Sequence, residues 1–155
     1  MIKLVLYQPD IPQNVGSLLR LAACLDIAAH VIEPCGFAFD DKRLRRVGMD
    51  YLEHVEIVRH SSWQSFLDYR QTHVGRLILL TTKAIASYTG AAFQPDDYIM
   101  VGRESSGVPQ EVNEKAEVSL RIPMHPSVRS LNVGLAASMV LGKALRQTNQ
   151  FPKNL

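Results

Sequence analysis

The sequence predicts an α/β fold in which one parallel sheet is flanked by helices. Short apolar runs alternate along the chain with stretches of helical periodicity, a pattern typical of parallel sheets. Leu77–Leu80 and Tyr98–Val101 are continuously apolar, as expected of strands buried on both faces. With 155 residues, 46% of them hydrophobic, the chain can build one sizeable core. We therefore expect a single domain over residues 1–155, with a loose tail from about residue 148.

The first part of the chain is expected to hold three strands and three helices. The first strand ends at a two-proline turn, Pro9 to Pro12, and Asn14 is a suitable cap for the helix that follows. Ser61 and Gln64 have the spacing of a capping box. The expected strands are Leu4–Tyr7, His30–Glu33 and Val55–Arg59, and the expected helices are Asn14–Leu25, Asp40–Val47 and one that runs through Tyr69.

The second part of the chain continues this alternation. Pro123 is expected to end the last strand, because proline has no backbone donor for the ladder. A loop follows, and then Ser130 or Asn132 is expected to cap the longest helix. The expected strands are Leu77–Leu80, Tyr98–Val101 and Val118–Ile122, and the helix is Leu131–Gln147.

Composition limits the classes of function. The net charge of +2 and the pI near 8.6 permit a nucleic-acid partner without requiring one. Cys24 and Cys35 are too few for a cysteine metal cluster and suit a reducing compartment. No stretch is apolar enough to span a membrane, and the N-terminal residues run directly into a strand. We therefore expect a soluble, cytoplasmic protein with no membrane partner.

The first segment with chemical potential lies at the start of the first expected helix. Asn14, Gly16 and Arg20 fall within its first two turns if the helix begins near Asn14. A glycine there permits close backbone approach at a point where a phosphate is favourably placed. A capping asparagine with a surface arginine explains the same residues, so this segment alone leaves both interpretations open.

The second segment directly follows the expected strand at Tyr98–Val101. Gly102 and Gly107 resemble the glycines of a phosphate loop, but Val108 and Pro109 stand where that loop needs Lys and Ser or Thr. A Walker site is therefore excluded, and the chain contains no G-x-G-x-x-G motif. A glycine at a strand's carboxyl end still lets a ligand press against the backbone. An ordinary tight loop is the alternative.

The third segment joins the end of the last expected strand to the start of the last helix. Ile122-Pro123-Met124 lead into a loop that ends at Ser130-Leu131-Asn132. A cap at Ser130 or Asn132 would point backbone N–H groups toward this loop. A strand end, a loop and a capped helix together form a ligand site in α/β proteins.

A cluster of cations lies between Asp41 and Arg46, and we call it the basic run. These cations could neutralise the phosphates of a nucleic acid, although most such runs are solvated helix faces. The five histidines show no ligand spacing, so metal catalysis has no support in the sequence. The basic run consists of Lys42, Arg43, Arg45 and Arg46.

In combination, the three segments resemble the three motifs of the SPOUT class of RNA ribose methyltransferases. The motifs read here as Asn14…Arg20, Gly102-x-Glu104-x-x-Gly107-x-Pro109 and Ile122-Pro123-Met124…Ser130-Leu131-Asn132. Further stretches narrow the resemblance to small single-domain enzymes that 2′-O-methylate the wobble cytidine or uridine of tRNA. Among these stretches are Leu6–Asn14, Gly36–Arg46 and Leu80–Lys83, and the resemblance runs from Leu4 to about Arg146.

The resemblance implies a C-terminal deep trefoil knot that holds S-adenosyl-L-methionine in a bent conformation. In the family, backbone groups of three loops bind this methyl donor, and the product is S-adenosyl-L-homocysteine. A sulfonium donor requires no metal, so no metal is expected. The expected cofactor-binding residues are Leu80, Gly102, Gly107, Ile122, Met124, Ser130, Leu131 and Asn132.

The resemblance also implies catalytic roles for Arg20, Asn14 and Glu104. The family's arginine is often assigned as the base that removes the 2′-hydroxyl proton, but a guanidinium stays protonated in proteins. We therefore expect Arg20 to bind the adjacent phosphate and to stabilise developing negative charge. Glu104 is a second candidate base, or it orients Asn14 or Arg20.

Two partners follow from the resemblance: the tRNA anticodon stem-loop and a second copy of the chain. Gly134, Ser138 and Gly142 recur at four-residue spacing, so another helix could settle closely on the last helix. Family members are homodimers whose active sites combine both chains, which favours a subunit contact over internal packing. The alternatives are a non-catalytic RNA-binding module of this fold, a 2′-O-methyltransferase for another tRNA or rRNA site, and a nucleotide-binding regulator.

Overall fold

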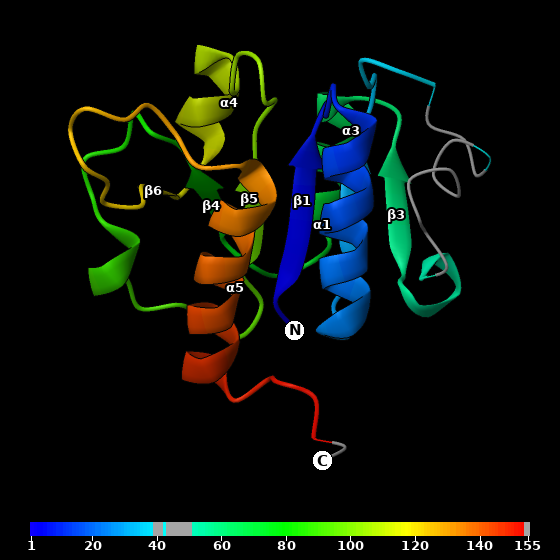
Figure 1. Ribbon diagram of the computed structural model, residues 1–155. Coiled ribbons are helices and arrows are strands. Elements are labelled where there is room, and N and C mark those ends of the chain that lie inside the picture. The colour runs from blue at the N-terminus through cyan, green and yellow to red at the C-terminus, as the bar shows by residue number, and fades with distance from the viewer. Residues whose placement is uncertain (39–41, 43–50, 154–155) are drawn as a thin grey trace.

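The protein folds around one six-stranded sheet in which every strand pairing is parallel (Figure 1). The computed structural model describes residues 1–38, 42 and 51–153. The strand order is β3-β2-β1-β5-β4-β6. The predicted fold class and all six predicted strands are confirmed. The strands are β1 (Lys3–Tyr7), β2 (Ala29–Ile32), β3 (Ile57–His60), β4 (Leu77–Leu80), β5 (Tyr98–Val101) and β6 (Val118–Leu120).

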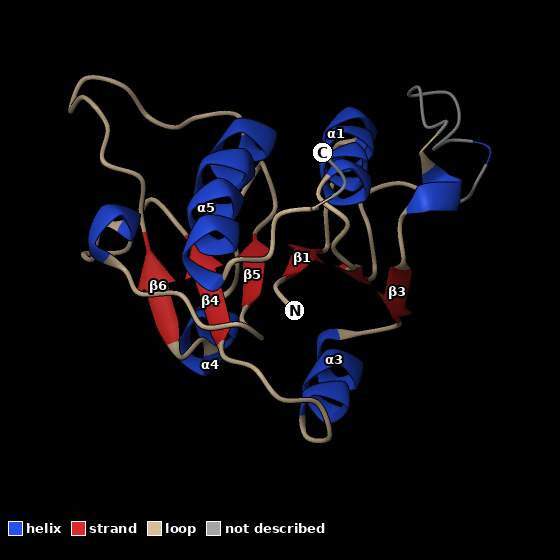
Figure 2. Cartoon of the chain, turned by 90° about the horizontal axis from the view of Figure 1, so that it is seen from below, coloured by secondary structure: helices blue, strands red, loops and turns tan. Residues whose placement is uncertain are grey.

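Helices cover both faces of this sheet (Figure 2). Helices α1 and α5 pack against each other on one face, and α3 and α4 lie on the opposite face. Each face of the sheet has its own apolar core, and β4 contributes side chains to both. Ile78 belongs to the core beneath α1 and α5, whereas Leu77 and Leu79 belong to the core on the opposite face. The helices are α1 (Pro12–Cys24), α3 (Trp63–Arg70), α4 (Gln110–Lys115) and α5 (Val133–Thr148), with short 3-10 turns η1 (Leu52–His54) and η2 (Tyr88–Gly90).

The register of the sheet brings the carboxyl ends of three neighbouring strands into line. Leu80 pairs with Val101 on one side and with Leu120 on the other. The loops that follow β4, β5 and β6 therefore begin beside one another. From β1 the chain builds outward to β2 and β3 on one side, while β5 flanks β1 on the other. Such a change of direction is where open α/β sheets place their ligands.

Two predicted helix caps are wrong. α1 begins at Pro12 with Ile11 as its cap residue, so Asn14 is the third residue of the helix. Proline is favoured at the first helical position because its missing N–H would be unpaired there anyway. In α3 the cap is Ser62, whose Oγ accepts from the backbone N–H of Ser65 at 3.0 Å. The predicted capping box is therefore displaced by one residue.

The structure also revises the ends of several elements. β2 and β3 begin one and two residues away from their expected starts, and β6 stops at Leu120, before Pro123 is reached. Beyond β6, Arg121 makes an isolated bridge with Ser87. Asn132 is the cap of α5, as one of the two predicted alternatives. α4 was not expected. The helix expected at Asp40–Val47 lies outside the described residues except for Lys42, which is exposed.

The segment after β6 lies against the loop that follows β4. Thr81 N–H donates to the Leu120 carbonyl, and Arg121 N–H donates to the Ala86 carbonyl, both at 2.9 Å. The trefoil knot implied by the resemblance concerns this region and stays a prediction. Within the expected tail, the Gln150 side chain accepts from Ile2 N–H at 2.8 Å and donates to the Pro95 carbonyl at 2.9 Å. The division into one domain and a loose tail also stays a prediction.

Candidate functional site

The three strand-end loops and the start of α5 enclose a cleft of about 870 Å³, which we call the strand-end cleft. Its walls come from the carboxyl ends of β4, β5 and β6, as their shared register requires. All eight residues expected to bind a cofactor line it, and so do Asn14 and Glu104. The eight are Leu80, Gly102, Gly107, Ile122, Met124, Ser130, Leu131 and Asn132.

The loop from Gly102 to Gly107 closes on itself. Arg103 and Gly107 exchange two backbone hydrogen bonds of 3.0 and 2.8 Å, and Gly107 has a φ of 65°. A Cβ placed on Gly102 would lie 2.8 Å from the carbonyl carbon of Gly107. The loop's own backbone therefore requires a glycine at position 102, and the expected contact of Gly102 with a cofactor stays a prediction. Gly107 is required by its left-handed conformation.

Asn132 connects the start of α5 to α1. Its Oδ1 accepts from Gly134 N–H at 2.8 Å and from Leu135 N–H at 3.3 Å. Its Nδ2 donates to Oδ1 of Asn14 at 3.3 Å. Asn14 thus lines the cleft and contacts Asn132. Because Asn14 lies inside α1, its side chain is not used as the cap of that helix and is available for this contact.

Glu104 contacts the segment between β1 and α1. Its Oε2 accepts from Asp10 N–H at 3.2 Å, and Ser105 next to it donates to the Asp10 carboxylate. Arg103 extends over the Tyr7 ring, with its guanidinium carbon 5.3 Å from the ring centroid, and donates to Gln8. The expected contact between Glu104 and Asn14 or Arg20 is not among the hydrogen bonds of the described residues; Asp10 is the partner instead.

Arg20 does not line the strand-end cleft. It is exposed on α1, with its guanidinium 4.7 Å from the centroid of the Tyr51 ring. Arg20 lies six positions after Asn14 on α1, which corresponds to a rise of about 9 Å along the helix. At this spacing the two side chains point to different sides of α1. Of the basic run, Lys42 is exposed and the three arginines lie outside the described residues, so its role stays a prediction.

The charge around the strand-end cleft is strongly positive. Among the described residues that line it, four are cationic and Glu104 alone is acidic. Burial and the Asp10 carboxyl raise the pKa of Glu104, which reduces the negative charge further. Of these cations, only Arg103 was expected from the sequence to place a positive charge near an RNA-facing rim, and Arg121 was expected inside the last strand. The four cations are Lys83, Arg103, Arg121 and Arg129.

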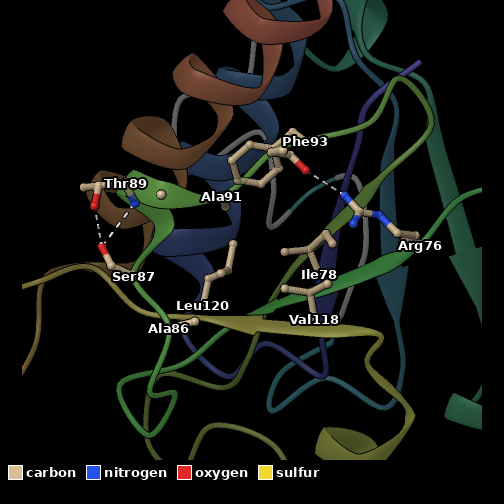
Figure 3. Close-up of a pocket in the computed structure, with 11 residues that line it drawn as sticks. Arg76, Ile78, Ala86, Ser87, Thr89, Ala91, Phe93, Val118 and Leu120 are labelled. Carbon is tan, nitrogen blue, oxygen red and sulfur yellow. Dashed lines mark hydrogen bonds between the residues drawn. The ribbon is translucent and has the colours of Figure 1, made fainter.

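A second pocket, of about 430 Å³, lies between η2 and the outer strands β4 and β6 (Figure 3). Its walls are mostly apolar, and none of the predicted site residues lines it. Its one cation, Arg76, is held by the buried carboxylate of Asp97 at 2.8 and 2.9 Å. In the described part of the chain, no three metal-binding side chains gather as a metal site would need. The expectation of metal-free chemistry stays a prediction.

Comparisons with known proteins agree with this geometry. A tRNA (cytidine(34)-2′-O)-methyltransferase of Beijerinckia indica subsp. indica is 51% identical over 97% of this chain and 94% of its own. The protein of the same name from Escherichia coli strain K12 is 43% identical over 95% of this chain and 94% of its own. A solved structure described as giving insights into the 2-OH methylation of C/U34 on tRNA is 40% identical, covers 95% of both chains and has a TM-score of 0.87.

A family model also matches most of the sequence. It matches residues 1–142, which include all six strands, the strand-end cleft and the first part of α5. No helix in the described ranges is long and apolar enough to cross a membrane. The chain belongs to the SpoU rRNA methylase family.

Proposed function

We propose that this protein is a tRNA 2′-O-methyltransferase that transfers a methyl group from S-adenosyl-L-methionine to the ribose of wobble nucleotide 34. The observation that carries the proposal is the strand-end cleft, where all eight expected cofactor residues come together from three loops that lie far apart in the sequence. The relatives that share this sequence over almost its full length are named for that reaction at cytidine 34.

The strand-end cleft fits the methyl donor in size and chemistry. Its volume of about 870 Å³ falls within the range of about 300–1,000 Å³ that is usual for small-molecule sites. Leu80, Leu120 and Ile122 offer an apolar slot for the adenine ring. Thr81 and Ser130 offer hydroxyls for the polar parts. The self-closed loop from Gly102 to Gly107 is formed before a ligand arrives, which lowers the cost of binding.

The reaction requires alignment and charge stabilisation more than covalent chemistry. Bound S-adenosyl-L-methionine supplies a methyl group on a positively charged sulfur, an electrophile that needs no metal. The residues that line the strand-end cleft would hold this donor beside the ribose 2′-hydroxyl, whose proton would pass to the RNA phosphate or to water. Arg20 stays protonated, binds the adjacent phosphate and stabilises negative charge on the oxygen. Such positioning supplies much of the rate in reactions of this kind.

We infer that the active enzyme is a homodimer. Arg20 lies outside the cleft of its own chain. The Arg20 that acts in this cleft would therefore come from the partner subunit. An exposed apolar strip suits the contact: Leu135 and Met139 on α5 are 59% and 43% exposed. A Cβ on Gly142, one turn further along α5, would meet no atom within 4 Å, so a helix of the partner could approach closely.

The tRNA anticodon stem-loop is the expected substrate. Four cations line the strand-end cleft, and they suit an approaching phosphate backbone. The basic run would extend this contact beyond the wobble nucleotide. We place the enzyme in the cytoplasm, where its substrate is made, and expect activity to persist in the presence of a metal chelator.

The decisive experiment is methyl transfer to two matched tRNA transcripts. One carries an ordinary ribose at nucleotide 34, and the other carries a 2′-deoxyribose there. The first transcript should gain one methyl group, located at nucleotide 34 by mass spectrometry of its nucleosides, and the second should gain none. Equal methylation of both transcripts would refute the assigned position. Binding of S-adenosyl-L-methionine without any transfer would favour the non-catalytic RNA-binding module.

A second experiment tests the role of Arg20 and the dimer together. Arg20→Ala should bind S-adenosyl-L-methionine normally but lose activity by about 10²-fold or more. Gly102→Val should distort the cofactor loop. When the two inactive variants are co-expressed, mixed dimers should regain activity, because one site combines an intact cleft with an intact Arg20. Failure to regain activity in purified mixed dimers would show that Arg20 serves its own chain.

A further inference from the structure

Two carboxyl groups meet at the rim of the strand-end cleft, those of Asp10 and Glu104. Asp10 N–H donates to Oε2 of Glu104 at 3.2 Å, and Ser105 Oγ donates to Oδ2 of Asp10. The other oxygen, Oδ1 of Asp10, is buried and has no hydrogen-bond donor among the described residues. A buried carboxylate oxygen without a donor is costly, so a donor is required that the heavy-atom contacts do not supply.

A proton on Glu104 would supply this missing donor. Burial raises the pKa of Glu104, and its contact with the Asp10 side chain raises it further. The same contact lowers the pKa of Asp10. Two adjacent carboxyl groups that share one proton behave in this way, because both cannot ionise at such short range. The two directions agree with a proton on Glu104 and a negative charge on Asp10, which is the arrangement that the unpaired Oδ1 of Asp10 requires.

Among the described residues around this pair, none donates a hydrogen bond to Oδ1 of Asp10. Arg103, the nearest cation in the same loop, is directed at Gln8 and the Tyr7 ring. Cys35, from the loop after β2, has its thiol pKa raised to about 11 by burial and by nearby charges, and this thiol makes no hydrogen bond to Oδ1 of Asp10. Glu33 and Arg59, whose charges act on the Cys35 thiol, form an ion pair in which a guanidinium nitrogen of Arg59 lies 2.5 Å from Oε1 of Glu33.

We propose that Asp10 is a positioning residue of the strand-end cleft, held by a hydrogen bond that the protonated Glu104 donates to its Oδ1. Asp10 lies two residues before Pro12, where α1 begins, and Glu104 lies in the loop that lines the cleft. The shared proton therefore fixes the cofactor loop to the helix that carries Asn14 and Arg20. This inference rests on the proposed function only where it concerns methyl transfer.

The assignment changes the role of Glu104 and predicts a pH dependence. A protonated carboxyl that already donates to Asp10 is not a base for the ribose hydroxyl. Once the pH rises above the pKa of Glu104, the shared proton is lost and two negative charges face each other. The loop and the start of α1 should then separate, so both cofactor affinity and methyl-transfer rate should fall as the pH rises through that pKa, and we call this loss the alkaline fall.

The pairing is tested first on the free protein, without reference to any activity. Carbon-13 NMR of protein labelled at the glutamate carboxyls follows each group through a pH titration, and Glu104→Gln identifies the signal of Glu104. We expect this signal to titrate at higher pH than the other glutamates, and Asp10→Asn to lower its titration point. Titration of Glu104 within the ordinary glutamate range would overturn the proposal, whether or not the protein methylates tRNA.

The positioning role is tested by comparing two substitutions of Glu104. The Glu104→Gln amide can still donate to Asp10 Oδ1, whereas Glu104→Ala cannot. We expect both variants to be slower than the parent, with Glu104→Gln about tenfold faster than Glu104→Ala; tenfold corresponds to about 1.4 kcal/mol, the size of one hydrogen bond. The glutamine variant should also lose the alkaline fall in rate.

A matched control is Glu111→Gln on α4, an exposed acid whose loss should leave the pH–rate profile unchanged. If Glu104→Gln is as slow as Glu104→Ala and the alkaline fall persists in it, Glu104 acts as an ionised group and the proposal is wrong. If none of the proteins methylates tRNA but the NMR titration behaves as expected, the carboxyl pair stands and the proposed function fails.

Discussion

Asn132 performs two separable tasks, and substitution can separate them. Its Oδ1 caps α5 through Gly134 N–H and Leu135 N–H, and its Nδ2 joins the cap to Asn14. Asn132→Ala removes both. Because Asn132 is exposed, little buried surface is lost, and the cost should be that of a missing cap, about 1 kcal/mol. For a chain of this size that lowers the melting temperature by about 2–4 °C.

Asn132→Asp removes only the second task. A carboxylate keeps the acceptor for the two N–H groups and places a negative charge at the start of α5, where it is favourable by about 0.3–1 kcal/mol. Its melting temperature should therefore equal or exceed that of the parent. It cannot donate to Asn14, so its methyl-transfer rate should fall together with that of Asn14→Ala, which leaves the cap intact.

Thermal unfolding followed by circular dichroism and a methyl-transfer assay on the same samples give the two readouts. We expect Asn132→Ala to lose both stability and activity, and the other two variants to lose activity alone. An unchanged melting temperature in Asn132→Ala would refute the capping argument. Full activity in both Asn132→Asp and Asn14→Ala would show that the contact between these two side chains has no part in the site.

Three further predictions follow from individual contacts. Gly102→Ala should destabilise the protein as well as weaken cofactor binding, since its Cβ would lie 2.8 Å from the backbone of Gly107, and denaturant unfolding measures the loss. Neutralising the basic run should weaken tRNA binding and flatten its salt dependence without changing cofactor affinity, and an unaltered salt slope would mean that the run is only solvated. Burial beside His60 lowers the pKa of His30 from 6.5 to about 4, so the unfolded chain binds more protons below pH 6.5. Stability should fall as pH drops from 6.5 toward 4, by about 3 kcal/mol from this group, and His30→Leu should show a shallower fall in urea unfolding.

The fold could be predicted from the sequence because its central strands are strongly marked. Leu77–Leu80 and Tyr98–Val101 are continuous apolar runs, and the second ends at Gly102. Helix starts were less predictable. At α1 the sequence offers Asn14 as a polar cap, but Pro12 fixes the first turn two residues earlier. Asn14 therefore lies inside α1 and not at its cap, and its side chain lines the cleft.

The meeting of the expected cofactor residues in one cleft could be predicted because they lie in loops that follow strand ends, and strand register decides which strand ends meet. The cations around the cleft follow the same strand ends, but a single Lys or Arg in a loop carries no signal of its own. Asp10 could not be found in this way either. Its role depends on an unpaired buried oxygen and on the carboxyl group of Glu104, which lies 94 residues further along the chain. Such a pairing exists only once β1 and β5 lie side by side.

At Gly102 the structure gives a reason for glycine that the sequence did not offer. Its place at the end of β5 suggested that a ligand presses on the backbone, yet the atoms nearest to its missing side chain belong to Gly107 in the same loop. The two interpretations differ in what they say of the empty protein. If a ligand required the glycine, the loop could remain open until binding. Because the loop's own backbone requires it, the cleft is shaped before the cofactor arrives, and a substitution at Gly102 should be felt in the absence of any ligand.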